Sequence, residues 1–115
     1  MPGQYTNVKY SEVLVISSYQ EYKVTLEELH SLLKQYGEEH WADYFKQSLN
    51  LLYQGKPQKS IAHTLSAYGG MGSFNDSLFF TGASQDESER GFILRSQLWV
   101  ICKNKNNIIK RLLEW

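Results

Sequence analysis

A run of leucines between residues 25 and 37 constrains the fold of this chain more than any other feature. Its members fall on one face of an α-helix and are Leu26, Leu29, Leu32 and Leu33. Thr25 and Glu28 have the spacing of a capping box, and Gly37 fits the residue that follows a helix end. We therefore predict a helix that ends near Gly37 and either begins at Thr25 or continues a helix that starts near Ser11.

Three later segments have the same helical periodicity. We predict helices over residues 38–54, over residues 57–68 with Pro57 in the first turn, and from about residue 92 to residue 115. Asparagines are weak helix formers, and several of them predict a bend or break in the last helix near residues 104–107. The apolar stripe of that helix, which we expect to face the core, is Leu94, Leu98, Ile101, Ile108 and Leu112.

The other segments are polar or ambiguous. Residues 12–24 contain a β-branched run that fits a strand or a buried helical turn, and we favour a helix because no convincing partner strand follows. Residues 81–91 are predicted to form a polar loop, and residues 1–10 a loose arm. The fold class is therefore predicted to be all-α. We expect residues 1–115 to form a single helical domain, a compact bundle of four to five helices with a glycine-rich turn after the third.

Composition excludes several classes of protein. The 115 residues suffice for one domain, and 12 cations balance 12 carboxylates, so a global basic field for nucleic acid is absent. The single cysteine, Cys102, allows neither an internal disulfide nor a cysteine-rich zinc site, and we expect it to be buried. No segment is apolar and long enough to span a membrane, and no signal peptide is evident. We therefore expect a cytoplasmic chain that has no membrane partner.

Residues that could carry chemistry do not form a recognisable catalytic pattern. The histidines, His30, His40 and His63, lack the spacing of a metal site, so we expect no metal and no other cofactor. A triad of His63, Ser73 and Asp76 would be defined by geometry, and the presence of these residue types alone is no evidence for one. We therefore expect that the chain is not an enzyme.

Charge is distributed unevenly along the chain, with an acidic middle and a basic segment at residues 95–115. One explanation is intramolecular, with the basic helix packed beside acidic ones. The other is that the start of the helix over residues 38–54 offers an acidic surface to a basic partner, because such surfaces steer association. The candidate partner-binding residues are Glu38, Glu39, Asp43 and Tyr44.

A glycine-rich turn is the second candidate site. It consists of Gly69, Gly70, Met71, Gly72, Ser73, Phe74, Asn75 and Asp76. Glycines let backbone amides approach an anion, but the lysine of a phosphate-binding loop is missing and the cluster follows a helix, whose C-terminal dipole repels phosphate. The structural alternative is that the glycines end one helix and that Ser73, Asn75 or Asp76 caps the next element.

The sequence SAYGGMGSFNDSLFF at residues 66–80 resembles a small bacterial family of uncharacterised helical proteins. Its members carry a GGMGS-(F/L)-ND motif after two helices and a tryptophan early in the second helix, here Trp41. The resemblance covers residues 25–80 and implies no established activity. In size and charge balance the chain is also similar to the immunity proteins of bacterial toxin systems.

Two functional hypotheses follow from these observations. The first is a protein-binding inhibitor, a toxin-neutralising immunity protein that occludes its cognate toxin with the acidic helix start around Glu38 or with the loop at residues 70–90. The alternative is a small-ligand-binding protein or an enzyme that uses the Gly69–Asp76 turn. A structural hypothesis is a homo-oligomeric helical module that associates through its last helix. Nucleic acid is not an expected partner, and the sequence leaves the oligomeric state open.

Overall fold

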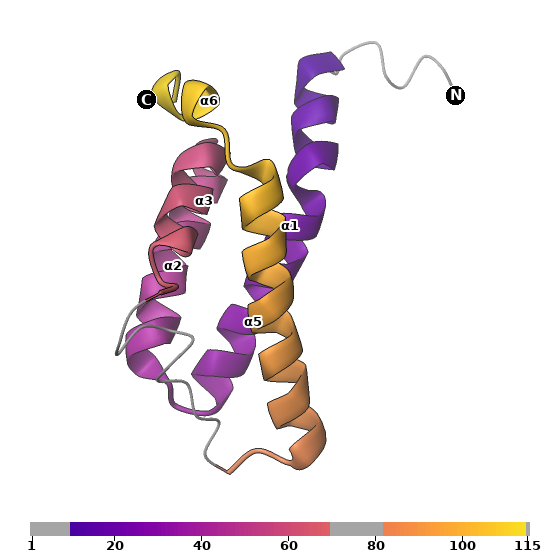
Figure 1. The fold of residues 1–115 in the computed structure, drawn as a ribbon, viewed down its shortest axis with the longest axis vertical. Helices are drawn as coiled ribbons and strands as arrows, with labels where there is room; N and C mark the ends of the chain where they lie inside the picture. Colours follow the sequence, from indigo (N-terminus) through magenta and orange to yellow (C-terminus); the bar gives the residue numbers. More distant parts are fainter. Residues whose placement is uncertain (1–9, 70–81, 115) are drawn as a thin grey trace, which may run out of the picture.

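The structure of this chain is a computed structural model that describes the backbone of residues 10–69 and 82–114, with side chains from residue 19 onward. The described chain is all-α, as predicted, and forms a helical bundle (Figure 1). Its helices are α1 (Tyr10–Gln35), α2 (Glu39–Tyr53), α3 (Pro57–Leu65), α5 (Gln85–Lys105) and α6 (Ile108–Leu112). The predicted arm at residues 1–9 and the predicted turn at residues 70–76 lie outside the described residues.

The long helix α1 settles the ambiguity of residues 12–24, which are helical as favoured. It also decides between the two alternatives for the leucine-rich helix, which continues an earlier helix and does not start afresh at Thr25. This residue is buried in the interior of α1 and does not begin a helix. Its neighbouring backbone amides already bond within the helix, so the capping-box spacing has no free donors to satisfy.

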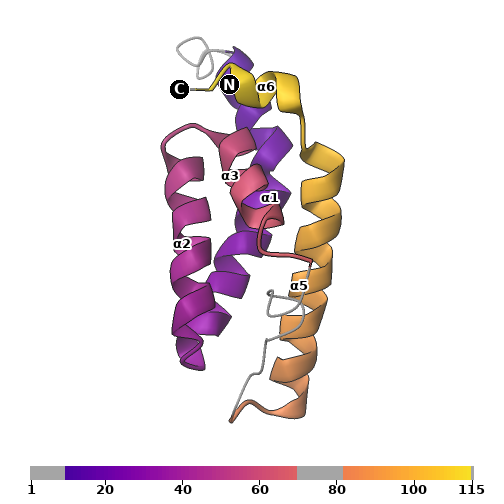
Figure 2. The same ribbon diagram turned by 60° about the vertical axis from the view of Figure 1, so that its left-hand side comes forward.

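Four helices form a ring in which each packs against two neighbours. The packed pairs are α1–α2, α2–α3, α3–α5 and α1–α5, which leaves α2 and α5 on opposite sides of the bundle (Figure 2). Gly37 and Gly55 make the tight turns on either side of α2, with φ of 71° and 80°, a region that glycine enters without steric cost. The predicted antiparallel pairing across Gly37 is confirmed.

The core lies inside this ring and draws on all four helices. Its largest fully buried side chains include Tyr22 of α1, Phe45 of α2, Ile61 of α3 and Leu98 of α5. Cys102 is fully buried, as expected, and burial raises the pKa of its thiol to about 12. A thiol with such a pKa is not a reactive nucleophile.

A network of buried hydroxyl groups joins three of the helices. The Tyr22 hydroxyl lies 2.6 Å from Ser60 Oγ and 2.9 Å from Thr64 Oγ1. Ser60 Oγ donates to the Ser48 carbonyl oxygen at 2.6 Å, and Thr64 Oγ1 donates to Ser48 Oγ at 2.7 Å. Because buried polar groups cost free energy when they lack partners, this network fixes how α1, α2 and α3 can pack together.

Helix α5 begins earlier than the sequence suggested. Residues 85–91 were expected in a polar loop, but α5 starts at Gln85. Ser84 caps it, since its Oγ accepts a hydrogen bond from the Glu87 backbone amide at 3.2 Å. Acidic side chains in the first turn also favour a helix start, because the helix dipole is positive there.

The predicted break near residues 104–107 is confirmed, but the last helix does not bury its stripe as expected. Helix α5 ends at Lys105, and Asn107 caps α6 by accepting from the Lys110 amide at 3.0 Å. Ile108 and Leu112 are 59% and 73% exposed. The break redirects the chain, so the stripe stays in the core only as far as Ile101.

Candidate partner-binding site

The start of α2 places the predicted carboxylates at one end of the bundle. Glu38 is the residue before the helix, and Glu39 lies in its first turn. Glu39 and Asp43 are exposed, whereas Glu38 is half-buried. The backbone amides of the first turn carry partial positive charge, which stabilises carboxylates at this position.

The start of α5 brings further carboxylates to the same end. Gln35, the last residue of α1, donates from Nε2 to Glu87 Oε2 at 3.5 Å. A hydrogen bond from the Tyr36 phenol holds the pKa of Glu87 below its ordinary value. We call the combined group the acidic end. It comprises Glu38, Glu39, Asp43, Asp86, Glu87 and Glu89.

The nearest arginine on α5 is committed to a different carboxylate. Arg90 donates from Nε and Nη2 to the two oxygens of Glu28 on α1, each at 2.7 Å. This pair lowers the pKa of Glu28 below its ordinary value. Among residues 19–69 and 82–114 no other ion pair forms, so no described cation is in an ion pair with a carboxylate of the acidic end. A further basic residue, Lys34, lies in the last turn of α1, where that helix approaches this end.

Tyr44 differs from the three predicted carboxylates of α2, because it is tied to α3. Its ring stacks on His63 with 4.1 Å between ring centroids and an interplanar angle of 15°. Its hydroxyl donates to the His63 carbonyl oxygen at 2.8 Å, and His63 Nε2 lies 3.1 Å from the Tyr44 carbonyl oxygen. Tyr44 therefore positions α2 against α3, and part of its surface remains accessible to a partner.

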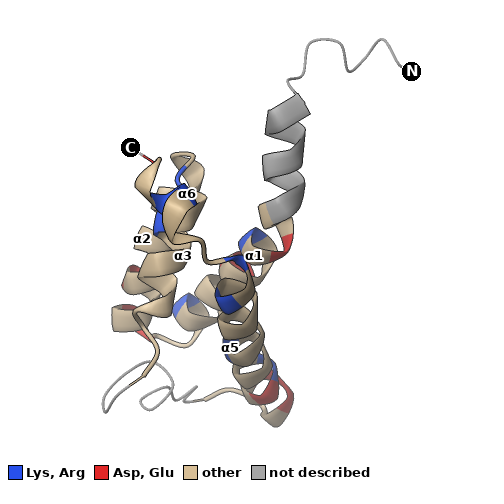
Figure 3. Cartoon of the chain, turned by 45° about the horizontal axis from the view of Figure 1, so that its top comes forward, with Lys and Arg blue, Asp and Glu red and all other residues tan. Residues whose placement is uncertain are grey.

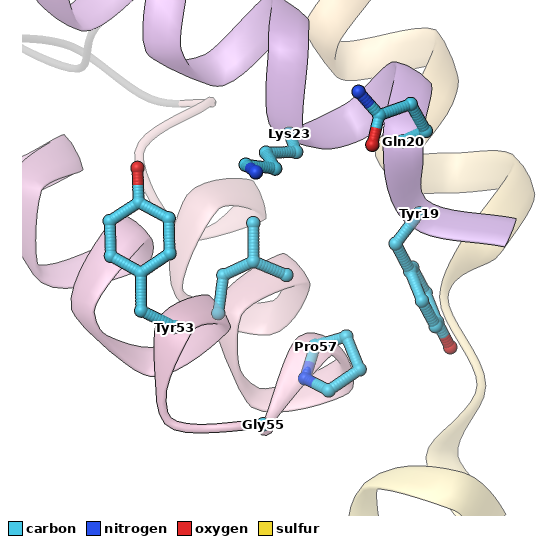
Figure 4. A pocket seen from close by; sticks show the side chains of 7 residues that line it. Tyr19, Gln20, Lys23, Tyr53, Gly55 and Pro57 are labelled. Atoms are coloured by element: carbon cyan, nitrogen blue, oxygen red, sulfur yellow. The ribbon is translucent and has the colours of Figure 1, made fainter. Parts of the chain in front are cut away.

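A hollow of about 270 Å³ lies at the other end of α2, where sequence reasoning predicted no site. Tyr19 and Lys23 of α1 line it together with Tyr53, the last residue of α2, and Pro57, the first residue of α3. The two tyrosine rings stand on opposite sides, with the Lys23 ammonium group between them (Figure 4). Apolar walls with one cation suit a small aromatic or aliphatic group that carries an anionic substituent.

The glycine-rich turn is described only at its first residue. Gly69 has a φ of 93°, so a glycine is suited to end the segment after α3. Residues 70–76 lie outside the described residues, and their proposed roles stay predictions. Within the part of the chain with described side chains, no group of histidine, cysteine and acidic residues could hold a metal ion.

Comparisons with known proteins give one match. Residues 34–86 match the profile of a family described as a domain of unknown function, DUF6966. The matched range contains the carboxylates of α2 and the whole Gly69–Asp76 turn, whereas most of α1, nearly all of α5 and all of α6 lie outside it. No curated protein and no solved structure matches the chain. Within the described residues, no helix is long and apolar enough to cross a membrane.

Proposed function

We propose that this chain is a protein-binding inhibitor, an immunity protein whose acidic end covers the basic substrate cleft of a cognate toxin. The observation that supports this most is the separation of charge in a chain with zero net charge. The acidic end collects carboxylates from the starts of two helices, whereas the cations of α6 and of the last turn of α5 lie at the opposite end (Figure 3). Occlusion requires no catalytic group, so the proposed chain is not an enzyme.

The proposed mechanism is electrostatic steering followed by docking of a rigid surface. An acidic face raises the rate at which a basic partner arrives, and salt screens this effect. The start of α2 is held in place by the buried Phe45 ring and by the Tyr44–His63 stack. Because the carboxylates project from a helix that is already packed, docking orders little new structure and so costs little conformational entropy.

A charge-reversal experiment tests the proposal. The tagged chain is used to capture proteins from a lysate of its source at low and moderate salt, beside the variants Glu39→Lys, Asp43→Lys and Glu21→Lys. Glu21 is an exposed carboxylate of α1 outside the acidic end, so its reversal is the matched control for net charge. We expect one stoichiometric partner for the original chain and for Glu21→Lys, and at least tenfold less for the other two.

The association rate of the purified pair gives a second measure. We expect it to fall steeply with salt and to slow by about tenfold for Asp43→Lys, because steering depends on unscreened charge. Capture that is equal for all variants, or an association rate indifferent to salt, contradicts the acidic end as the binding surface.

A cytoplasmic location is part of the same proposal, since the inhibitor must be present where its toxin would act.

The hollow beside Tyr19 supports a second candidate function, the binding of a small apolar anion. A thermal-shift series with small aromatic carboxylates tests it, since a ligand that binds only the folded state raises the melting temperature. A rise that is lost in Lys23→Gln supports the small-ligand function. A series without any rise removes this hollow from consideration and leaves the Gly69–Asp76 alternative to be tested separately.

A further inference from the structure

Helix α6 turns its apolar face away from the bundle. Positions 108 and 112, and positions 109 and 113, are each four residues apart, so the four aliphatic side chains form two adjacent rows on one side of α6 and its C-cap residue. Their exposed fractions are Ile108 59%, Ile109 72%, Leu112 73% and Leu113 73%. The half-buried side chains of this segment are the polar ones, Arg111 and Glu114.

Polar contacts on the bundle side hold α6 in this orientation. The Glu114 carboxylate accepts hydrogen bonds from the backbone amides of Gln58 and Lys59, both at 2.7 Å. These amides belong to the first turn of α3, where donors lack partners within their own helix. The buried Gln58 side chain also accepts from the Asn107 amide at 2.7 Å and donates to the Lys105 carbonyl oxygen at 2.8 Å.

Cations surround the exposed aliphatic side chains. They come from the end of α5, from α6 and from the start of α3, and Figure 3 marks in blue the positions of basic residues along α6 and α5. We call this region, with its exposed aliphatic side chains, the basic end. Its cations are Lys56, Lys59, Lys103, Lys105, Lys110 and Arg111. Among residues 103–114, the one carboxylate is that of Glu114, which accepts hydrogen bonds from backbone amides of α3.

These features disfavour a second copy of the chain as the partner of this surface. Two copies related by a two-fold axis would place the same cations opposite each other, and like charges across an interface repel. The area that four aliphatic side chains can bury also falls short of the roughly 800 Å² per partner that a stable protein interface buries.

A membrane surface fits the basic end better than another protein does. Binding hot spots between proteins favour tryptophan, tyrosine and arginine, whereas leucine is under-represented in them. Helices that lie in a membrane interface combine an apolar face, rich in leucine and aromatic residues, with a polar face rich in lysine and arginine. Cations near the surface of an anionic membrane strengthen the binding. Neither the insertion of apolar side chains nor this attraction to the headgroups requires a large buried area.

We propose that the basic end docks on membrane surfaces that contain anionic lipids, with the aliphatic side chains of α6 inserted among the acyl chains and the surrounding cations on the headgroups. The proposed docking is peripheral, because α6 inserts side chains only and no helix among the described residues could span the bilayer. It departs from the expectation of no membrane partner, which rested only on the absence of a spanning segment. The acidic end lies at the far end of the bundle, so a docked molecule keeps it free for a protein partner.

Vesicle co-sedimentation tests this proposal on the intact chain. Vesicles of pure phosphatidylcholine are compared with vesicles of equal parts phosphatidylcholine and phosphatidylglycerol, at low and moderate salt. We expect binding to the anionic vesicles that is at least tenfold stronger than to the neutral ones and that weakens with salt. Two double variants of the basic end should each weaken binding by about tenfold. One is Leu112→Ser with Leu113→Ser, and the other is Lys110→Gln with Arg111→Gln.

Matched controls distinguish binding through the basic end from nonspecific binding to vesicles. Val24→Ser with Ile93→Ser removes two aliphatic side chains that are also exposed but lie on α1 and α5. Lys34→Gln with Lys46→Gln removes two cations outside the basic end. Both controls should bind anionic vesicles as the original chain does, and circular dichroism should show an unchanged helix content for every variant.

Three outcomes would overturn the proposal. They are an absence of vesicle binding, equal binding to neutral and anionic vesicles, and equal weakening by the control changes. A concentration-dependent dimer in light scattering that Leu112→Ser with Leu113→Ser abolishes, without any vesicle binding, would assign the face to a second copy. Because these experiments contain no protein partner, their failure leaves the proposed role of the acidic end untouched.

Discussion

Helices α2 and α6 are both amphipathic, but they turn opposite faces to the bundle. Helix α2 buries Trp41 and Phe45 and exposes Glu39 and Asp43. Helix α6 exposes all of its aliphatic side chains, and Arg111 is the residue of α6 that is partly covered. The same kind of sequence pattern therefore gives an acidic surface at one end of the molecule and an apolar, basic surface at the other.

The difference lies in what each helix meets. Helix α2 packs beside α1 and α3, whose inward faces supply apolar side chains such as Leu29 and Ile61. Helix α6 meets the first turn of α3, which presents backbone amides and the Gln58 side chain. Free amides at a helix start require acceptors, so they attract the polar side of α6. The neighbour decides which face of a short amphipathic helix is buried.

The largest expected effect contrasts one apolar residue from each helix. Phe45→Ala should lower the free energy of unfolding by about 3–5 kcal/mol, because it empties a fully buried site. Leu112→Ala should change it by less than about 0.5 kcal/mol, because that side chain is largely exposed. Urea unfolding followed by circular dichroism measures both. A large loss for Leu112→Ala would mean that the apolar face of α6 is covered.

The buried hydroxyl network provides the next contrast, between an interior and a surface tyrosine. Tyr22→Phe should cost about 1–3 kcal/mol, because it removes a hydroxyl partner from the buried Ser60 and Thr64. Tyr53→Phe is the control, and its cost should stay below about 1 kcal/mol. Its hydroxyl is on the surface, where the Glu27 carboxylate raises the pKa of Tyr53 to about 12. Equal losses would show that the network does not stabilise the packing of the three helices.

The anchor of α6 can be removed without touching its aliphatic side chains. Glu114→Ala should cost about 0.5–2 kcal/mol, the range for loss of a helix cap, because two amides of α3 lose their acceptor. Trypsin should then cleave after Lys110 and Arg111 severalfold faster than in the original chain or in Glu21→Ala. Unchanged cleavage would mean that the carboxylate does not hold α6 on the bundle.

The smallest expected effect concerns pH and the exposed pair on α1 and α5. Because Arg90 lowers the pKa of Glu28 in the folded chain, the pair stabilises the fold above the unfolded glutamate pKa of about 4.3. That contribution is lost as the pH falls through the lower, folded pKa. Glu28→Gln should lower the free energy of unfolding by about 0.2–1 kcal/mol near neutral pH and by less at low pH. A loss independent of pH would point to packing instead of charge.

Much of the fold could be predicted from local pattern. The leucines of α1, the glycines that end α1 and α2, and the asparagines before α6 all act through neighbouring residues in the chain. The start of α5 was missed because its first turns are polar and lack a hydrophobic period. A signal was present in Ser84 and Glu87, which have the spacing of a capping box.

The candidate sites depend on contacts that no local pattern contains. The carboxylates at the start of α2 could be predicted, but their placement at one end with those of α5 requires the antiparallel order of the helices. The outward face of α6 depends on Gln58 and Glu114, which are far apart in the sequence and meet only in the folded chain. The hollow between Tyr19 and Pro57 likewise forms only when α1 packs against the α2–α3 turn.

Hydrogen–deuterium exchange of the chain, alone and bound to the partner captured in the charge-reversal experiment, tests the central claim most directly. The account predicts that amides of residues 39–43 and 85–90, at the starts of α2 and α5, exchange more slowly in the complex. It also predicts unchanged exchange in residues 108–112 of α6, which lie at the opposite end. Protection confined to α6 or to the hollow beside Tyr19, with an unchanged acidic end, would contradict it.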